Sequence, residues 1–331
     1  MMEMKERGYT TMFDFHLPSP APVLLAREKK PGLHWVLEIL VFLVVTVLSF
    51  VGQFIFGFPA LLVLQLSSPE YRAALASGDK DLAAQIMARL LDSDGYVVLS
   101  LLANSMMIIV ALLFCKLLQK RGAASLGFIR KGMGREYLAG AGAGALAFSA
   151  AALLCIVTGS LRLEGISPTF RPVMFALMLM GFLVQGMAEE VLCRGYFMVS
   201  LARRYPLWAA VLANSVLFAA LHLFNSGITV LAFVNLVLFG VFASLYFVRR
   251  GNIWGIGAFH ALWNFVQGNV YGVLVSGGGT NCTLLDSTSV PGRELINGGD
   301  FGLEGGLAVT AVLAVGCLLM LYRKKENGSE Q

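Results

Sequence analysis

Long runs of apolar residues, separated by short polar segments, make up most of this chain. Eight of these runs are candidate membrane spans, because a helix needs about 20 mostly apolar residues to cross a bilayer. They cover residues 35–58, 96–118, 137–158, 172–198, 207–224, 228–248, 253–275 and 306–322. The pattern predicts an all-α, polytopic membrane helix bundle with about eight transmembrane helices.

The composition agrees with a protein that lies largely within a membrane. Of the 331 residues, 57% are hydrophobic and 14% are charged, and the mean hydropathy is +0.74. Soluble domains carry about 25% charged residues. The chain is therefore expected to be an integral, multi-pass protein, with a bacterial cell membrane as the expected location.

The basic residues are distributed unevenly over the predicted loops. With the N-terminus placed in the cytoplasm, 18 of the 25 Lys and Arg residues fall on the inner side and 6 on the outer side. Cytoplasmic loops of membrane proteins carry such an excess. The distribution predicts that both termini are cytoplasmic. It also explains the net charge of +5 without a nucleic-acid partner.

The segments outside the eight runs suggest a simple organisation. Residues 1–34 are expected to form a cytoplasmic tail that is mostly disordered up to Lys30, with local order in places, residues 35–322 the bundle, and residues 323–331 a second cytoplasmic tail. The outer loop 67–95 has the spacing of an amphipathic interfacial helix. The Gly- and Ser-rich outer loop 276–305 is expected to be irregular and mobile. Five cysteines without a CxxC pair favour neither a disulfide framework nor a thiolate zinc site.

Three short motifs place ionisable side chains inside apolar runs. They are Glu189-Glu190-Val-Leu-Cys-Arg194, Phe218-Ala-Ala-Leu-His222 and His260-Ala-Leu-Trp-Asn264. Ionisable groups at membrane depth are costly and are retained mainly where they pair or line a polar cavity. The motifs therefore suggest an active site assembled from separate helices.

Helical spacing suggests how the first motif is divided. Glu190 and Arg194 are four residues apart, so they share a helix face and can form an ion pair behind the site. Adjacent helical residues point about 100° apart, which leaves Glu189 to face a cavity, where it could serve as a base. The alternative is that both glutamates only brace helices.

The other two motifs use the same spacing. Phe218 shares a face with His222 and is expected to pack against or orient the imidazole. His260 and Asn264 also share a face, where they could bind an oxyanion, a water molecule or a metal ion. Other polar residues of the spans are expected to form hydrogen bonds between helices, namely Glu38, Asn104, Gln185, Asn214 and Asn235. The segment Gly140-Ala-Gly142-Ala-Gly144 contains small residues at four-residue spacing, which allows close helix packing.

Taken together and in this order, the three motifs resemble those of the CPBP intramembrane proteases, the family of type II CAAX prenyl endopeptidases and bacteriocin-immunity (Abi) proteins. The resemblance covers roughly residues 120–275. It implies hydrolysis of a peptide bond in a membrane-associated substrate. It also implies that Glu189 activates the attacking water, while His222, His260 and Asn264 bind or polarise the scissile carbonyl. Whether a metal takes part stays open: either the site has no cofactor, or Glu189, His222 and His260 hold zinc.

Two other classes of function remain alternatives. A catalytically silent relative would act as a scaffold, an immunity protein or a regulator of another membrane protein. A transporter with a proton-relay carboxylate is disfavoured, because no internal repeats are found. The hydrolase interpretation requires that Glu189, His222, His260 and Asn264 converge on one cavity. The sequence does not indicate whether the substrate is prenylated.

Overall fold

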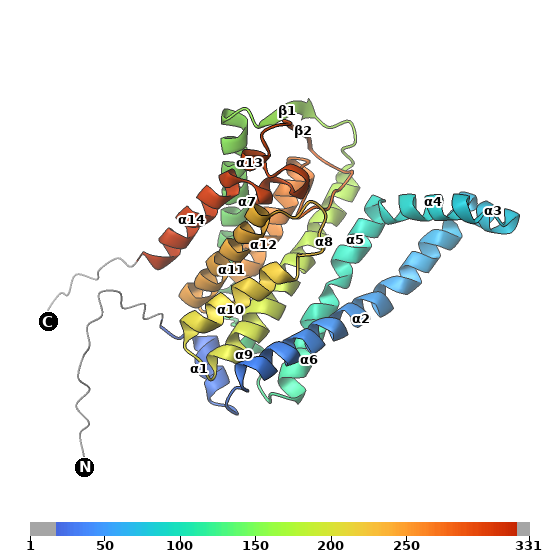
Figure 1. Ribbon diagram of the computed structural model, residues 1–331. Coiled ribbons are helices and arrows are strands. Elements are labelled where there is room, and N and C mark those ends of the chain that lie inside the picture. Colours follow the sequence, from blue (N-terminus) through green and yellow to red (C-terminus); the bar gives the residue numbers. More distant parts are fainter. Residues whose placement is uncertain (1–17, 323–331) are drawn as a thin grey trace, which may run out of the picture.

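The computed structural model describes residues 18–322 of the chain. The expectations for residues 1–17 and 323–331, which include most of the two predicted tails, lie outside the described residues. Helices dominate the rest of the chain (Figure 1). Each of the eight predicted apolar runs is mostly helical, which confirms an all-α membrane bundle.

The long helices follow the predicted runs closely. They are α2 (Trp35–Ser67), α5 (Asp94–Ala103) with α6 (Ser105–Leu117), α7 (Met133–Val157), α8 (Pro172–Glu190) continued by a π-helix (Val191–Met198) and α9 (Val199–Ala202), and α11 (Val230–Arg250). By length and composition these five stretches can each cross a membrane. The remaining runs form shorter helices, namely α10 (Leu207–Ala220), α12 (Trp254–Phe265) with a second π-helix (Val266–Val270), and α14 (Leu307–Leu321).

Part of the N-terminal tail is locally ordered, within a segment expected to be mostly disordered. Helix α1 (Ala21–Arg27) begins after Pro20, and its Val23 and Ala26 are fully buried. The Arg27 side chain donates a hydrogen bond of 2.9 Å to the carbonyl of Ala202 in α9. Residues 21–27 are locally ordered because a short apolar face, too small to stand out in the sequence, packs on the bundle.

The outer loop 67–95 is helical, but as two helices rather than one. They are α3 (Pro69–Ser77) and α4 (Lys80–Leu91), and they pack on each other through Ala74, Ala83 and Ile86. Gly78 ends α3 in the left-handed conformation, and the Asp79 side chain caps α4. A residue with positive φ followed by a capping residue turns the chain between two helices.

The second outer loop contains short regular elements, although it was expected to be irregular. Strand β2 (Leu285–Ser289) pairs antiparallel with β1 (Leu161–Ile166), and α13 (Glu294–Asn297) follows. Phe301 and Leu303 are fully buried. Figure 1 shows β1, β2 and α13 together at one end of the bundle, with α1 and α9 at the other. Despite their Gly- and Ser-rich composition, residues 276–305 form a folded cap at this end of the bundle.

Helix α12 lies at the centre of the bundle, against α7 and α8. A Cβ atom on Gly140 of α7 would lie 1.9 Å from the carbonyl oxygen of Gly255, and one on Gly144 would lie 2.2 Å from that of Phe259. Only glycine allows the two backbones to approach this closely. The predicted close packing of the glycine segment is thereby confirmed, and its partner is the helix that carries His260 and Asn264.

Candidate active site

The crossing of α8 and α12 places the first and third motifs beside each other. At Gly186 of α8, an added Cβ would lie 2.4 Å from the backbone nitrogen of Ala261 in α12. This contact is three residues before Glu189 and one after His260. The small residue therefore sets the distance between the paired glutamates and the histidine.

Glu190, Arg194 and His260 form a buried group behind the cavity. Nη1 of Arg194 lies 2.9 Å from Oε1 of Glu190, and both side chains are fully buried. The same carboxylate oxygen lies 2.9 Å from Nδ1 of His260. The guanidinium also lies over the Phe218 ring, 4.5 Å from its centroid, a cation–π distance. Glu190 therefore joins the first and third motifs, Arg194 adds the second through Phe218, and Glu190 does not line the cavity itself.

A π-helix begins directly after Glu190, and the buried side chain of Arg121 forms hydrogen bonds with it. Arg121, which is 1% exposed, donates to the carbonyl of Tyr196 in this π-helix and to the hydroxyl of Ser200. Burial lowers the pKa of the Arg121 guanidinium. Its hydrogen bonds compensate for part of the lost hydration. π-Helices leave backbone groups without their usual partners and occur often at functional sites.

Glu189 faces the cavity and belongs to a chain of side-chain hydrogen bonds. Gln185, four residues earlier in α8, donates from Nε2 to Oε1 of Glu189. Nδ2 of Asn264 donates to Oε1 of Gln185 at 3.0 Å. Oε2 of Glu189 lies 3.8 Å from Nε2 of His260, and the Glu189 side chain is 20% exposed. The direction of the chain is determined by Glu189, because an ionised carboxylate only accepts.

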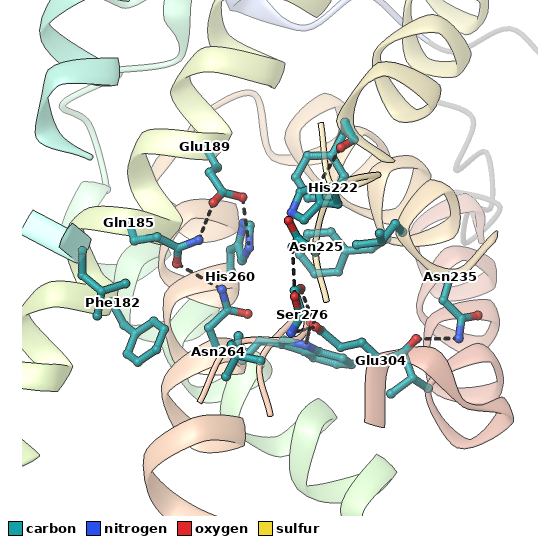
Figure 2. A pocket seen from close by; sticks show the side chains of 18 of the residues that line it. Phe182, Gln185, Glu189, His222, Asn225, Asn235, His260, Asn264, Ser276 and Glu304 are labelled. Atoms are coloured by element: carbon teal, nitrogen blue, oxygen red, sulfur yellow. Dashed lines mark hydrogen bonds and ion pairs between the residues drawn. The ribbon is translucent and has the colours of Figure 1, made fainter. Parts of the chain in front are cut away.

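His222 lies across the cavity from this chain, as Figure 2 shows. The predicted run 207–224 placed His222 within a helix, but the residue follows the end of α10. Its Nδ1 is 2.8 Å from the carbonyl oxygen of Phe218, and the two rings are 4.8 Å apart. Because a carbonyl oxygen accepts, Nδ1 carries the proton and Nε2 is the atom left for the cavity.

The side chains of Glu189, His222, His260 and Asn264 line one cavity of about 240 Å³. Glu189 comes from α8, His222 follows α10, and His260 and Asn264 come from α12. Apolar side chains such as Leu101, Phe182 and Phe239 form much of the wall. The arrangement gives a carboxylate, two imidazoles and an amide access to the same space, as a hydrolase interpretation requires.

Several polar residues of the cavity were not predicted. Gln185 was expected only to bridge helices, although its spacing of four from Glu189 was a usable signal. Asn225, Ser276 and Glu304 also line the cavity. Asn225 follows His222 in a turn, and Ser276 and Glu304 belong to the segment 276–305. No helical spacing therefore related these residues to the motifs.

The remaining intramembrane polar residues mostly bridge helices, as expected. Asn214 donates to Ser244 of α11 at 3.1 Å, and Asn235 accepts from Thr310 of α14 at 2.7 Å. Glu38 pairs with Arg203 at 3.3 Å. Asn104 differs, because it donates to the Ser100 carbonyl of its own chain segment at the junction between α5 and α6.

The donor set does not fit a three-ligand zinc site in this arrangement. Of the proposed ligands, Glu189 and His260 approach each other, but no three His, Cys, Asp or Glu side chains within residues 18–322 gather closely enough to hold a metal ion. A metalloprotease assignment is therefore not supported.

Residues 171–266 match the family described as "Type II CAAX prenyl endopeptidase Rce1-like". The matched range contains all three motifs and most of the cavity, and it confirms the resemblance seen in the sequence. This part of the chain is thus similar to the type II CAAX prenyl endopeptidase family. No curated protein and no solved structure gives a significant match.

Proposed function

We propose that this protein is an intramembrane endopeptidase that hydrolyses a peptide bond of a membrane-associated substrate. The proposal rests on the different environments of two adjacent glutamates. Glu190 is fully buried and paired with Arg194, whereas Glu189 opens onto the cavity. A carboxylate that pairs with no Lys or Arg among the described residues, next to a space for water, has the features of a general base.

In this proposal Glu189 takes a proton from a water molecule in the cavity, and the oxygen attacks the scissile carbonyl carbon. Gln185 holds one carboxylate oxygen, which leaves the other free to bind the water. The proton then moves from Glu189 to the leaving nitrogen as the carbon–nitrogen bond breaks. Protons balance, because the carboxylate returns to its ionised state at the end of the cycle.

Asn264 and the two histidines would stabilise the oxyanion. Asn264 uses one amide hydrogen for Gln185, which leaves the second for the developing charge. His260 and His222 each keep Nδ1 on an acceptor, so each offers Nε2 to the cavity. A protonated imidazole donates from that nitrogen. Apolar walls exclude bulk water and strengthen these interactions.

The experiment is a proteolysis assay on the purified protein in lipid nanodiscs, with candidate membrane peptides. Glu189→Gln keeps the shape of the side chain but removes the base, so cleavage should fall by about 10²-fold or more. Glu164→Gln, on an exposed position of β1, is the matched control and should keep full activity. Thermal unfolding should show that both variants are folded.

Undiminished cleavage by Glu189→Gln would end the hydrolase assignment for this site. Such cleavage would come from another site or from a contaminating protease, and a wild type that loses all cleavage on further purification would favour a catalytically silent scaffold.

A further inference from the structure

Glu304 is a second carboxylate in the same cavity, on a segment outside the matched domain. It is 9% exposed and lies just before α14. Oε1 accepts a hydrogen bond of 3.0 Å from the indole of Trp263, which is next to Asn264 on α12. Oε2 accepts from the backbone nitrogen and the hydroxyl of Ser276 at 2.9 and 2.7 Å. Three neutral donors thus orient the carboxylate, and a carboxylate has room for about four.

No positive side chain accompanies this charge. Among the ion pairs formed within residues 18–322, none includes Glu304. The other three most buried carboxylates of the described chain each have a basic partner, namely Glu38 with Arg203, Asp94 with Arg171 and Glu190 with Arg194. Buried charges in proteins are normally paired, because leaving one unpaired is costly. Glu304 departs from this rule at a position that opens onto the cavity.

The rest of the cavity lining combines acceptors with neutral donors and carries no permanent cation among the described residues. Glu189 and Glu304 both line it, and its lining within the described residues includes no lysine or arginine. Oδ1 of Asn264 is buried without a hydrogen-bond partner, in a residue that is 4% exposed. In Figure 2 this oxygen points away from Gln185, toward the space between the two carboxylates. This acceptor is therefore left without a donor, which a ligand could supply.

We infer that the cavity selects substrates with a lysine or arginine side chain near the scissile bond, and that Glu304 is the residue that binds this side chain. The inference rests on the proposed peptidase function and specifies its substrate class. The cationic group would occupy the free acceptor site of Glu304, with Asn264 Oδ1 as a second acceptor. An acidic residue at the same substrate position would meet two carboxylates and be rejected.

The turn that contacts Glu304 explains how the carboxylate is held over the cavity. Ser276 has a positive φ of 46°, uncommon for a residue with a side chain, and Gly277 follows with φ 85°. The Ser276 carbonyl also accepts from Asn225 at 2.9 Å, three residues after His222. The turn is thus tied to both sides of the site, which keeps Glu304 at a fixed distance from the reacting groups.

The test uses fluorogenic peptides of one apolar sequence, in which a single position near the cleavage site is Lys, Gln or Glu. Each position is scanned in turn with the full-length protein in nanodiscs. At one position kcat/KM should fall in the order Lys, Gln, Glu, with Lys exceeding Gln by about tenfold, as for a desolvated charge pair. Equal rates for Lys and Gln at every position would overturn the inference without any variant.

Glu304→Gln then assigns the preference to its residue. The ratio of the Lys rate to the Gln rate should fall to near one, whatever happens to the absolute rates. A merely structural role for Glu304 would lower both rates and leave their ratio unchanged, and that result also contradicts the inference. Asp286→Asn, an exposed carboxylate of β2 that belongs to the same cap, is the matched control and should retain the ratio.

A binding measurement separates this inference from the proposed reaction. Fluorescence anisotropy with the same labelled peptides and Glu189→Gln protein reports affinity without cleavage. A Lys preference in binding that disappears in the Glu189→Gln, Glu304→Gln double variant supports the acidic subsite, even if no peptide is hydrolysed. Hydrolysis that depends on Glu189 but shows no Lys preference supports the peptidase and refutes the subsite.

Discussion

At the scale of single residues, the fully buried Glu190 carboxylate is stabilised by two partners. Arg194 and His260 both contact Oε1 of Glu190, whereas Oε2 is buried without a partner. The carboxylate is thus already incompletely satisfied. Removal of one partner of a buried ion pair leaves an uncompensated charge, which is far more costly than loss of an exposed pair.

Arg194→Ala should therefore destabilise the protein by about 3–5 kcal/mol. The expected result is low expression and a lower melting temperature in detergent, measured by intrinsic fluorescence. Arg162→Ala, at an exposed position of β1, is the control and should melt like the wild type. An Arg194→Ala protein with normal stability and no activity would instead place Arg194 in the reaction.

At the scale of helices, the contact between α7 and α12 determines where the catalytic helix lies. Gly140 and Gly144 allow backbone contact with Gly255 and Phe259, the residue before His260. Gly142 lies between them in sequence but on another face, with nothing within 4 Å of an added Cβ. The same glycine-rich segment thus contains two positions that need glycine and one that does not.

Gly140→Ala and Gly144→Ala should each cost about 1–3 kcal/mol through overpacking. Gly142→Ala should be neutral or stabilising by up to about 1 kcal/mol, because alanine favours helices over glycine. Thermal unfolding of the three variants checks this. Gly144→Ala should also reduce proteolysis by displacing His260. Equal effects at all three positions would contradict the packing argument.

At the scale of the whole molecule, the two ends of the bundle carry different segments. Helices α3 and α4 and strands β1 and β2 lie toward one end, and α1 and α9 lie at the other (Figure 1). The end of α11 meets the start of α7 through the ion pair of Arg250 and Glu136.

Reporter fusions at Gly251 and after Lys325 should report cytoplasm, and fusions at Asp79 and Asp286 should report the outside. The expectation follows from the excess of basic residues on one side of the predicted spans. Alkaline phosphatase and green fluorescent protein give opposite signals on the two sides and serve as mutual controls. A cytoplasmic signal at Asp286 would contradict eight crossings.

The candidate site contains contacts within one helix, which the sequence predicted, and contacts between distant segments, which it did not. Spacing of four residues was enough to place Glu190 with Arg194 and to leave Glu189 apart, because both statements concern one helix. The bond between His260 and Glu190 joins residues 70 positions apart, and that between Glu304 and Trp263 spans 41. No local pattern relates such residues, so their contacts could not be predicted.

The sequence by itself determined the membrane class, the positions of the helical runs and the three motifs, because apolar length, helical period and charge bias are properties of neighbouring residues. Only the tertiary structure decided that residues 21–27 pack on the bundle, that the Gly-rich segment 276–305 folds into a cap, and that this cap adds Ser276 and Glu304 to the cavity. Those outcomes depend on which surfaces meet, and small contacts such as Gly186 against Ala261 determine where they meet.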